Sequence, residues 1–372
     1  MRVIMIGPFP PPVNGMTLAN KMLFEELRKR GIDIKLIDTK TSTKRENLSS
    51  QGKFSVRKTV LSILPIMKGV ARILFGRSYN VVYITPAQNV NSYLKYVPFM
   101  WAARVRKIPY VIHIHGGYFR KMYDSTSGWK RKIIDKSLNG LAGAIVLGPS
   151  LRYMFEGLIP DQKIFVCENG VEDMIFATEE EIKNKIERWK KDDTIRIVYL
   201  SSLMKTKGIL DLLEAVKILR NEGKKVHLDV AGPIEPEIKA EVDRFFSEFK
   251  DTVTYHGIVK GQKKKKLLLD NYIFCLPTYY PNEGQPISIL EAIANGCLIV
   301  STDHGGIRDI VDENVGTLVA KRSPSSIART LITNYNNIGN LFKIREKGLS
   351  KYKSSDYAMR ILRIFMYFCD KC

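Results

Sequence analysis

The sequence predicts an α/β protein built from two Rossmann-like, doubly wound domains. Short runs rich in β-branched residues alternate with amphipathic helical patterns in each half of the 372-residue chain. Such alternation is typical of parallel sheets whose strands are joined by right-handed helical crossovers. Because ligands of open α/β sheets bind beyond the carboxyl ends of the strands, we expect the two domains to face a central cleft that holds the site.

The strand patterns fall into two sets. The first set includes residues 2–7, 33–38, 80–85, 110–115, 143–148 and 163–169, and the second includes residues 195–200, 226–232, 252–257, 272–278 and 297–303. Amphipathic helical patterns lie between the runs, and those at residues 18–31 and 208–223 both end at a glycine, which favours helix termination.

A charged segment, residues 172–193, separates the two sets and is the predicted hinge. We therefore place an N-terminal domain at residues 1–177 and a C-terminal domain at residues 178–356. A last helix, at residues 357–372, is expected to pack back on the N-terminal domain.

The composition predicts an ordinary globular protein, with 45% hydrophobic and 26% charged residues. No apolar run is long enough to span a membrane, and the first strand runs into Gly and Pro too soon for a signal peptide. We expect a cytoplasmic protein. The five scattered cysteines predict no disulfide framework, and we interpret the CxxC of Cys369 and Cys372 as incidental because no second pair completes a metal site.

The net charge of +21 is unevenly distributed. No Asp or Glu occurs between Asn47 and Tyr123. Twelve cations lie there: Lys53, Arg57, Lys58, Lys68, Arg72, Arg77, Lys95, Arg104, Arg106, Lys107, Arg120 and Lys121. Residues 55–77 combine cations with apolar residues at helical spacing, and Pro65 would kink this helix or begin a second one. The pattern fits a helix that contacts an anionic membrane or a lipid diphosphate, and it equally fits a solvated helix packed on the domain by one face.

The stretch PNEGQPISILEAIANG, residues 281–296, carries the most informative pattern. Gly284 places Glu283 in a loop, Pro286 suits the first position of a helix, and Glu291 lies about one turn into that helix. Free N–H groups at a helix start favour an anion such as phosphate. The two acids then suit hydrogen bonds from hydroxyl groups. An alternative is that Ser288 and Glu291 form a capping box, in which Glu291 only binds a backbone donor.

Other candidates follow strands. Gly15 lies in a proline-rich loop after the first strand, before a helix that we expect to be capped near Thr17. At the end of the fourth strand, His115 precedes two glycines and is the candidate site residue, whereas His113 is expected in the sheet interior. After the first strand of the second set, Lys205 and Lys207 could reach a diphosphate as point charges.

Together these motifs resemble those of family-4 retaining glycosyltransferases of GT-B fold, over most of the chain and in the same order. The motifs are GPFPPPVNG, HIHGG, ENGVE, the KG before a helix, LPTYYPNEGQPISILEAIANG and STDHGGIRDIV. The resemblance implies transfer of a sugar from a nucleotide diphosphate with the anomeric configuration retained and without an obligatory metal. The absence of Asp-x-Asp from the sequence is consistent with this. The resemblance also implies that the first domain binds the acceptor and that the second binds the nucleotide sugar.

The resemblance implies a role for each candidate. Glu291 would bind the ribose hydroxyls of the donor, Glu283 the hydroxyls of its sugar, and His115 would lie near the reacting centre. Gly15 would belong to a loop that approaches the phosphates. The segment whose backbone meets sugar and phosphates would be Gly284, Gln285, Pro286 and Ile287, of which Pro286 has no N–H to offer.

Lys207 would neutralise the diphosphate. Close to it, the sequence departs from the family pattern at one place. Many members carry Gly-Arg-Leu where residues 201–203 read Ser-Ser-Leu, so the arginine that shares the diphosphate is missing. Lys205 could compensate, although an ammonium is a point charge and not a bidentate fork.

The predicted function is transfer of a hexose or N-acetylhexosamine, from a UDP-linked donor, to a lipid-linked or glycan acceptor hydroxyl in bacterial surface polysaccharide biosynthesis. The nucleotide sugar is a co-substrate, and no cofactor or metal is predicted. We expect the enzyme to be peripheral at the inner face of the membrane and to bind no nucleic acid. The alternatives are a nucleic-acid-binding protein that uses the basic face and a nucleotide-sugar 2-epimerase on the same fold.

Overall fold

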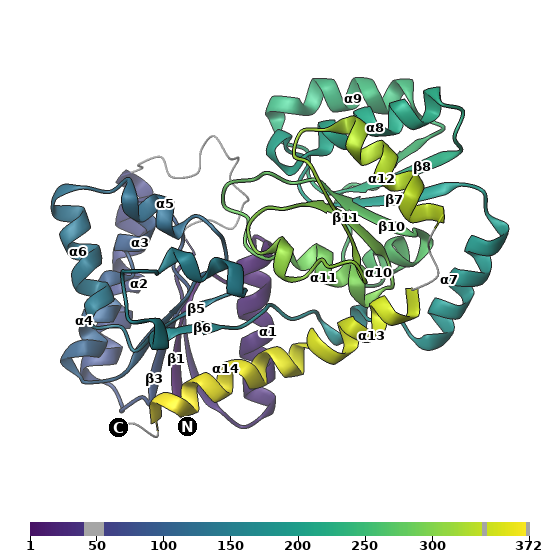
Figure 1. Cartoon of the computed structure of the whole chain (residues 1–372). Coiled ribbons are helices and arrows are strands. Elements are labelled where there is room, and N and C mark those ends of the chain that lie inside the picture. Colours follow the sequence, from purple (N-terminus) through teal and green to yellow (C-terminus); the bar gives the residue numbers. More distant parts are fainter. Residues whose placement is uncertain (41–55, 337–340, 370–372) are drawn as a thin grey trace. The chain divides into compact units, whose positions relative to one another are not determined.

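The computed structural model describes residues 1–40, 56–336 and 341–369, with only the backbone for residues 56–63. The chain forms two compact units (Figure 1). The first is Met1–Gly170 with Ser354–Cys372, and the second is Val171–Lys353. The chain therefore passes from one unit to the other after Gly170 and after Lys353, rather than after residues 177 and 356.

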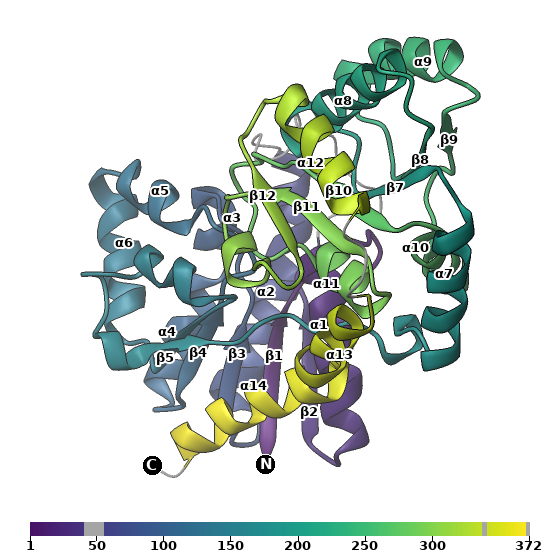
Figure 2. The same ribbon diagram turned by 45° about the vertical axis from the view of Figure 1, so that its right-hand side comes forward.

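The first unit contains a six-stranded parallel sheet in the order β2-β1-β3-β4-β5-β6, and Figure 2 labels the first five of these strands. Its strands are β1 (Arg2–Gly7), β2 (Asp33–Asp38), β3 (Val81–Ile84), β4 (Tyr110–His113), β5 (Gly143–Val146) and β6 (Ile164–Val166). All six predicted runs form strands. The inner strands β1, β3, β4 and β5 are apolar and buried between helices, as the central strands of a parallel sheet require, whereas the edge strand β2 keeps exposed residues.

Helices cover both faces of this sheet. They are α1 (Gly15–Lys29), α2 (Val56–Phe75), α3 (Val90–Leu94), α4 (Val97–Val105), α5 (Phe119–Asp124), α6 (Gly128–Asn139) and α14 (Ser354–Cys369). Alternation along β1 separates the two layers. Val3 and Met5 belong to the core shared with α1 and α14, whereas Ile4 and Ile6 belong to the core shared with α2 and α4. The α2 helix continues through Pro65 as one helix, so no second helix begins there.

The last helix, α14, completes the core of the first unit. Tyr357, Ile361 and Phe365 are fully buried against Val3 and the other residues of that layer. Each buried apolar side chain of this size contributes about 1.5 to 3 kcal/mol by removing its surface from water. The helix expected at residues 357–372 begins at Ser354. It packs on the first unit, although the second unit directly precedes it in the sequence.

The second unit contains a six-stranded parallel sheet in the order β12-β11-β10-β7-β8-β9. Its strands are β7 (Ile195–Leu200), β8 (Val226–Ala231), β9 (Val253–Tyr255), β10 (Ile273–Leu276), β11 (Leu298–Thr302) and β12 (Gly316–Val319). The first five were predicted. The edge strand β12 (GTLV) is only partly buried and lacks an apolar run, so its sequence carries a weak strand pattern.

Two layers of helices enclose this second sheet. They are α7 (Glu179–Lys191), α8 (Ile209–Asn221), α9 (Lys239–Glu248), α10 (Gly261–Asp270), α11 (Ile287–Ala294), α12 (Pro324–Asn336) and α13 (Leu341–Lys351). One face is covered by α8 and α12, and the other by α7, α10, α11 and α13 (Figure 1). Throughout the described residues, no helix combines the length and apolarity that crossing a bilayer requires.

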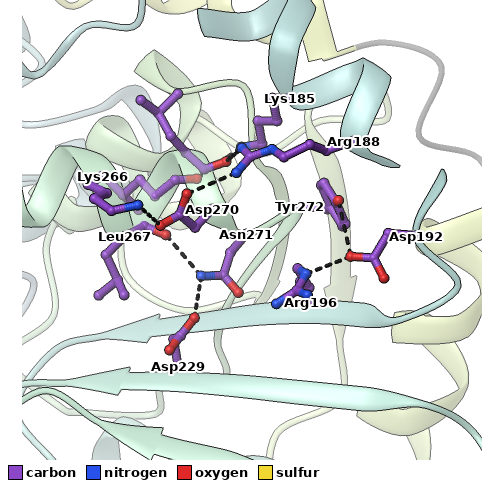
Figure 3. Close-up of polar contacts among 12 residues, drawn as sticks. Lys185, Arg188, Asp192, Arg196, Asp229, Lys266, Leu267, Asp270, Asn271 and Tyr272 are labelled. Carbon is purple, nitrogen blue, oxygen red and sulfur yellow. Dashed lines mark hydrogen bonds and ion pairs between the residues drawn. The ribbon is translucent and has the colours of Figure 1, made fainter. Parts of the chain in front are cut away.

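The predicted hinge, residues 172–193, is a packed part of the second unit. Its helix α7 buries Lys185 completely, and the ammonium donates to the carbonyl oxygens of Leu268 and Asn295. Figure 3 shows a second link, in which the carboxylate of Asp270 on α10 binds Arg188 of α7 and Lys266 of its own helix. The charge that made this segment resemble a linker instead binds α7 to α10.

Candidate functional site

Loops that follow β7 and β10 meet at the carboxyl edge of the second sheet. The amide of Tyr279 donates to the carbonyl of Thr206 at 2.8 Å. Gly208 has φ +75°, and a Cβ at this position would lie 2.2 Å from the carbonyl oxygen of Pro277. Only glycine allows so close an approach in this conformation. The Lys-Gly pair therefore fixes where Lys207 lies relative to the loop of Glu283.

A loop after β11 packs on the same segment. The amide of Gly306 donates to the carbonyl of Gly284 at 2.8 Å. Gly305 has φ +57°, and a Cβ there would lie 2.4 Å from the carbonyl oxygen of Glu283. Gly305 and Gly306, the two glycines of the STDHGGIRDIV motif, thus hold the backbone of Glu283 and Gly284 in place.

Lys207 and Glu283 form an ion pair within these loops. The Nζ of Lys207 lies 2.5 Å from Oε2 of Glu283, which also accepts a hydrogen bond from Oγ1 of Thr278 at 3.0 Å. The ammonium lies 4.9 Å from the centre of the Tyr280 ring, at cation–π range. Oε1 of Glu283 has no protein donor in the described part of the chain. The acid is therefore held by one oxygen and free to accept at the other.

The start of α11 lies directly after this loop. Pro286 is its N-cap and not its first residue, because the helix begins at Ile287, and no side chain caps it. Within residues 1–40, 56–336 and 341–369, the amides of Gly284, Ile287 and Ser288 have no acceptor. Unpaired N–H groups at a helix start carry partial positive charge and are suited to a phosphate group.

Glu291 lies one turn into α11 and does not bind its own backbone. Its Oε1 accepts from Nζ of Lys264 on α10, and the carboxylate is 4% exposed. Ser288 is the second residue of the helix and not its cap, so the capping-box alternative is wrong. Glu283 in a loop and Glu291 on a helix is the arrangement that the sequence predicted.

Two neighbouring charges shift the pKa of Glu291 in opposite directions. Burial raises the pKa of this carboxyl, the neighbouring Lys264 lowers it, and the carboxylate of Glu172 raises it further. An isolated buried carboxylate would take up a proton instead of staying charged. The ammonium of Lys264 therefore favours the ionised form of Glu291.

The loop that lacks the expected arginine has an exposed lysine. Lys205 and Lys207 are both in the short 3₁₀ turn η5 (Lys205–Lys207), but Lys205 is solvent-exposed whereas Lys207 is largely buried. Burial raises the pKa of Asp211, and the charges of Arg322 and Lys205 lower it. Lys205 thus lies near a carboxylate at the start of α8, and its ammonium does not join the Lys207 pair.

In the first unit, Gly15 is the first residue of α1. The cap is Asn14 and not Thr17: Oδ1 of Asn14 accepts from the amide of Thr17 at 3.0 Å, and Oγ1 of Thr17 accepts from the amide of Asn14. In the described part of the chain, the amides of Gly15 and Met16 have no acceptor. The helix start after β1 is therefore a second place where backbone donors are unpaired.

His115 follows β4 at the carboxyl edge of the first sheet, and both of its ring nitrogens are shielded from solvent. Its ring lies 4.1 Å, between centres, from that of His113. Burial lowers the pKa of His115 to about 4, and the nearby Asn169 side chain opposes this shift. As expected, His113 is fully buried, and its Nδ1 lies 2.7 Å from the Tyr83 hydroxyl. His115 is therefore neutral near pH 7.

The structure brings Lys207, Glu283, Gly284 and the start of α11 together in the second unit, and it places Gly15 and His115 in the first. Sequence reasoning missed three residues that bind the acids or the lysine: Lys264, Thr278 and Tyr280. A signal existed for Lys264, because it precedes the buried Leu268 by one helical turn and so shares its face.

The acidic residues do not gather into a metal site. Among the side chains that the structure describes, no three His, Cys, Asp or Glu residues could hold a metal ion together. Cys369 is half-buried, and its predicted CxxC partner, Cys372, lies outside the described residues.

Comparison with protein families matches residues 179–348 to the model of glycosyl transferases group 1. The matched region lies within the second unit and contains Lys207, Glu283, Glu291 and the start of α11.

Two curated relatives are bacterial polysaccharide glycosyltransferases by name. The putative teichuronic acid biosynthesis glycosyltransferase TuaC of Bacillus subtilis is 27% identical over 237 residues, which cover 62% of this chain and 55% of that protein. The amylovoran biosynthesis glycosyltransferase AmsK of Erwinia amylovora is 26% identical over 178 residues, which cover 46% of this chain and 42% of that protein. The chain thus spans about half the length of these relatives.

Solved structures share the fold over the whole chain. HepE from Anabaena, in complex with UDP, has a TM-score of 0.72 at 13% identity and covers 99% of this chain and 100% of its own. Sucrose-phosphate synthase from Thermosynechococcus elongatus has a TM-score of 0.71 at 14% identity, with 100% of both chains covered. These likenesses confirm the predicted fold class, two Rossmann-like domains of the GT-B type.

Proposed function

We propose that this protein is a retaining glycosyltransferase that transfers a hexose or N-acetylhexosamine from a UDP-linked donor to an acceptor hydroxyl. The observation that carries the proposal is the start of α11, where three backbone amides without an acceptor lie beside the Lys207–Glu283 pair. Amide dipoles and an ammonium suit a diphosphate, and carboxylate oxygens without donors suit sugar hydroxyls. The group 1 domain match and the UDP complex of HepE support the same assignment.

In this proposal each group binds one part of the donor. Glu291 accepts hydrogen bonds from the ribose hydroxyls, and Glu283 accepts them from the sugar through its free Oε1. The diphosphate meets Lys207 and the amides of Gly284, Ile287 and Ser288, and within the same segment, which includes Gln285, Pro286 sets the turn without donating. His115, neutral near pH 7, and the loop of Gly15 contribute from the first unit.

The reaction breaks the bond between the anomeric carbon and the diphosphate oxygen. Negative charge gathers on that oxygen as the bond stretches, and Lys207 with the amide dipoles stabilises it. The acceptor hydroxyl attacks from the same face, which retains the configuration, and its proton passes to the departing phosphate oxygen. No carboxylate acts as a nucleophile and no metal is required, because lysine and backbone donors take the charge that a metal would otherwise balance.

The missing arginine is expected to affect donor affinity more than the reaction itself. Lys205 is exposed in the same turn as Lys207 and can swing toward a bound diphosphate. An ammonium offers a point charge where a guanidinium would offer two parallel hydrogen bonds. Weaker donor binding than in arginine-containing relatives would follow.

We further propose that the acceptor is lipid-linked or a glycan and that the first unit docks on an anionic membrane. The outward face of α2 combines three apolar side chains with two cations: Leu64, Met67, Phe75, Lys68 and Arg72, with Phe75 85% exposed. On α4, which packs beside it, Trp101 and Val105 are also exposed. Exposed apolar residues between cations are typical of a helix at a lipid interface. Arg57 and Lys58 continue the charge pattern, but their side chains lie outside the described residues.

The names of the relatives support a role in surface polysaccharide synthesis, which would place the enzyme at the inner face of the membrane. They give no support to a nucleic-acid-binding protein or to a 2-epimerase. Salt-dependent binding to random DNA, without any hydrolysis of a donor sugar, would favour the first of these alternatives.

The decisive experiment is a thermal-shift screen of UDP-, GDP- and ADP-linked sugars, followed by measurement of donor hydrolysis. A donor that binds only the folded protein raises its melting temperature by mass action. We expect UDP-linked sugars to raise it and to be hydrolysed slowly without acceptor. If no nucleotide sugar shifts the melt and none is hydrolysed, the proposal is wrong.

A further inference from the structure

Three of the four consecutive lysines on α10 contact different acids. Lys264 binds Glu291 and is 13% exposed, whereas Lys266 binds Asp270 at 2.8 Å and is 77% exposed. Lys265 lies 2.8 Å from Glu181 of α7, and Lys263 is exposed. Only the first of these contacts reaches a residue of the candidate site.

The contact of Lys264 resembles that of Lys207. Each ammonium holds one oxygen of a buried carboxylate, Oε1 in Glu291 and Oε2 in Glu283. In both acids the other oxygen has no protein donor among the described residues. Each pair thus leaves one acceptor oxygen available for a hydroxyl group.

The surroundings of Glu291 would otherwise favour a neutral acid. The side chain is 4% exposed, and the segment of Glu172 packs against α10 close by, with Met174 lying 3.9 Å from where a Cβ of Gly261 would be. Lys264 and Glu172 are the charged groups that act on Glu291 in the described chain. A protonated carboxyl loses acceptor capacity at the oxygen that carries the hydrogen.

We propose that Lys264 is a positioning residue for donor binding, which keeps Glu291 ionised and turns its second oxygen toward the ribose hydroxyls of a nucleoside diphosphate. This inference rests on the proposed function, because it assigns Glu291 to the ribose. Lys264 itself touches the acid and not the donor. Its removal therefore affects binding through the charge of Glu291, and that effect must depend on pH.

The sign of this dependence is fixed by the contacts. Burial raises the pKa of Glu291 and Lys264 lowers it. Without Lys264 the pKa rises further, so a larger fraction of Glu291 is protonated at low pH and regains its charge as the pH rises. Nucleotide affinity of a Lys264 variant should therefore be poor in acid and recover in base.

The test is calorimetric titration of the full chain with UDP from about pH 5.5 to about pH 8.5. Lys264→Met is compared with Lys266→Met, which removes the same charge from the same helix, and with Lys264→Arg, which keeps it. We expect Lys264→Met to weaken UDP binding about tenfold near pH 6 and much less near pH 8.5. Lys266→Met should stay within about twofold of wild type throughout, and Lys264→Arg should restore the wild-type profile.

The outcomes separate the two proposals. If wild type does not bind UDP at any pH, the proposed donor is wrong and this inference falls with it. If wild type binds UDP but Lys264→Met follows Lys266→Met at every pH, only the positioning role is wrong. A weakening by Lys264→Met that is equal at all pH values also overturns it, since it would indicate a structural effect; circular dichroism at each pH checks that the variant remains folded.

Discussion

Lys207 and Glu283 form a 2.5 Å ion pair although they are 76 residues apart in the chain. Two features bring them together: the left-handed Gly208 that lets the lysine loop touch Pro277, and Gly305, which packs on the backbone of Glu283. Removing one partner leaves the other charge buried and unpaired, which is costly. The pair is therefore a sensitive point for testing the site.

Replacing Lys207 by Met should lower donor turnover about a hundredfold or more, because it removes a cation from the place where leaving-group charge develops. Initial-rate measurements with a UDP-sugar check this. Lys217→Met serves as the control, since the Lys217 side chain on α8 is 43% exposed and only approaches Glu214, at 3.8 Å. Equal rates for the two variants would remove Lys207 from the proposed mechanism.

Glu291→Ala should abolish the rise in melting temperature that a UDP-linked sugar causes, because the ribose loses its acceptor. Differential scanning fluorimetry with and without donor measures the shift. The exposed Glu313→Ala is the matched control and should keep the full shift. A shift that survives in Glu291→Ala would show that this acid does not bind the donor.

The outward face of α2 predicts membrane binding that needs both charge and apolar surface. Changing Lys68 and Arg72 to Glu, or Met67 and Phe75 to Ser, should each reduce binding to vesicles that contain phosphatidylglycerol, while neutral vesicles bind weakly in every case. Flotation assays give the bound fraction. Unchanged binding by both variants would leave α2 as a solvated helix.

Asp229 predicts an acid-sensitive contribution to stability. Burial alone would raise its pKa, but hydrogen bonds from His227, Asn271 and His256 lower it to about 2 (the Asn271 bond is drawn in Figure 3). The ionised acid therefore stabilises the fold above its usual pKa, and this contribution is lost as the pH falls toward the folded value.

Accordingly, Asp229→Asn should lower the free energy of unfolding by about 1 to 2 kcal/mol at neutral pH, after allowance for solvent screening. The difference from wild type should shrink between about pH 4 and about pH 2. Urea unfolding at several pH values measures it. A difference that is constant with pH would contradict the ionic explanation and indicate a packing effect.

Phe365→Ala should destabilise the first unit by about 3 to 5 kcal/mol, since the ring is fully buried and lies 5.5 Å from that of Tyr83. The neighbouring Met366→Ala, 51% exposed on the same helix, should cost about 0.5 kcal/mol or less. Thermal unfolding of both variants gives the comparison. Similar losses would mean that α14 contributes little to the core.

Periodicity was sufficient to predict both sheets and the loop-then-helix placement of Glu283 and Glu291, because each run had one consistent pattern. It missed β12, whose residues GTLV begin with Gly and Thr and are mostly not buried, so the stretch lacks the apolar run that marked the buried strands. The cap of α1 was predicted near Thr17 but is Asn14. These two residues hydrogen-bond to each other in a capping box, so the sequence alone does not show which of them is the cap. The exact ends of a helix depend on which nearby side chain binds its free backbone groups, and the sequence pattern does not determine this.

Which lysine binds which acid was harder to predict. In the run of lysines on α10, adjacent residues point in directions about 100° apart, so one position separates a site contact from a solvated one. The partner of Lys264 lies on α11, and only the packing of these two helices decides the pair. Long-range pairing of this kind has no signature in a single sequence.

The return of the chain to its first unit through α14 has a consequence for synthesis. Residues 354–369 leave the ribosome only after the whole of the second unit has been made, yet they supply one apolar layer of the first. Until then Val3 and Met5 have α1 but not α14 to pack against, whereas the second unit, which is made later, can already fold. During translation, synthesis of the first unit thus begins first, but its folding is completed last. Until α14 has been made, its strands can aggregate unless chaperones bind them or synthesis and folding are fast.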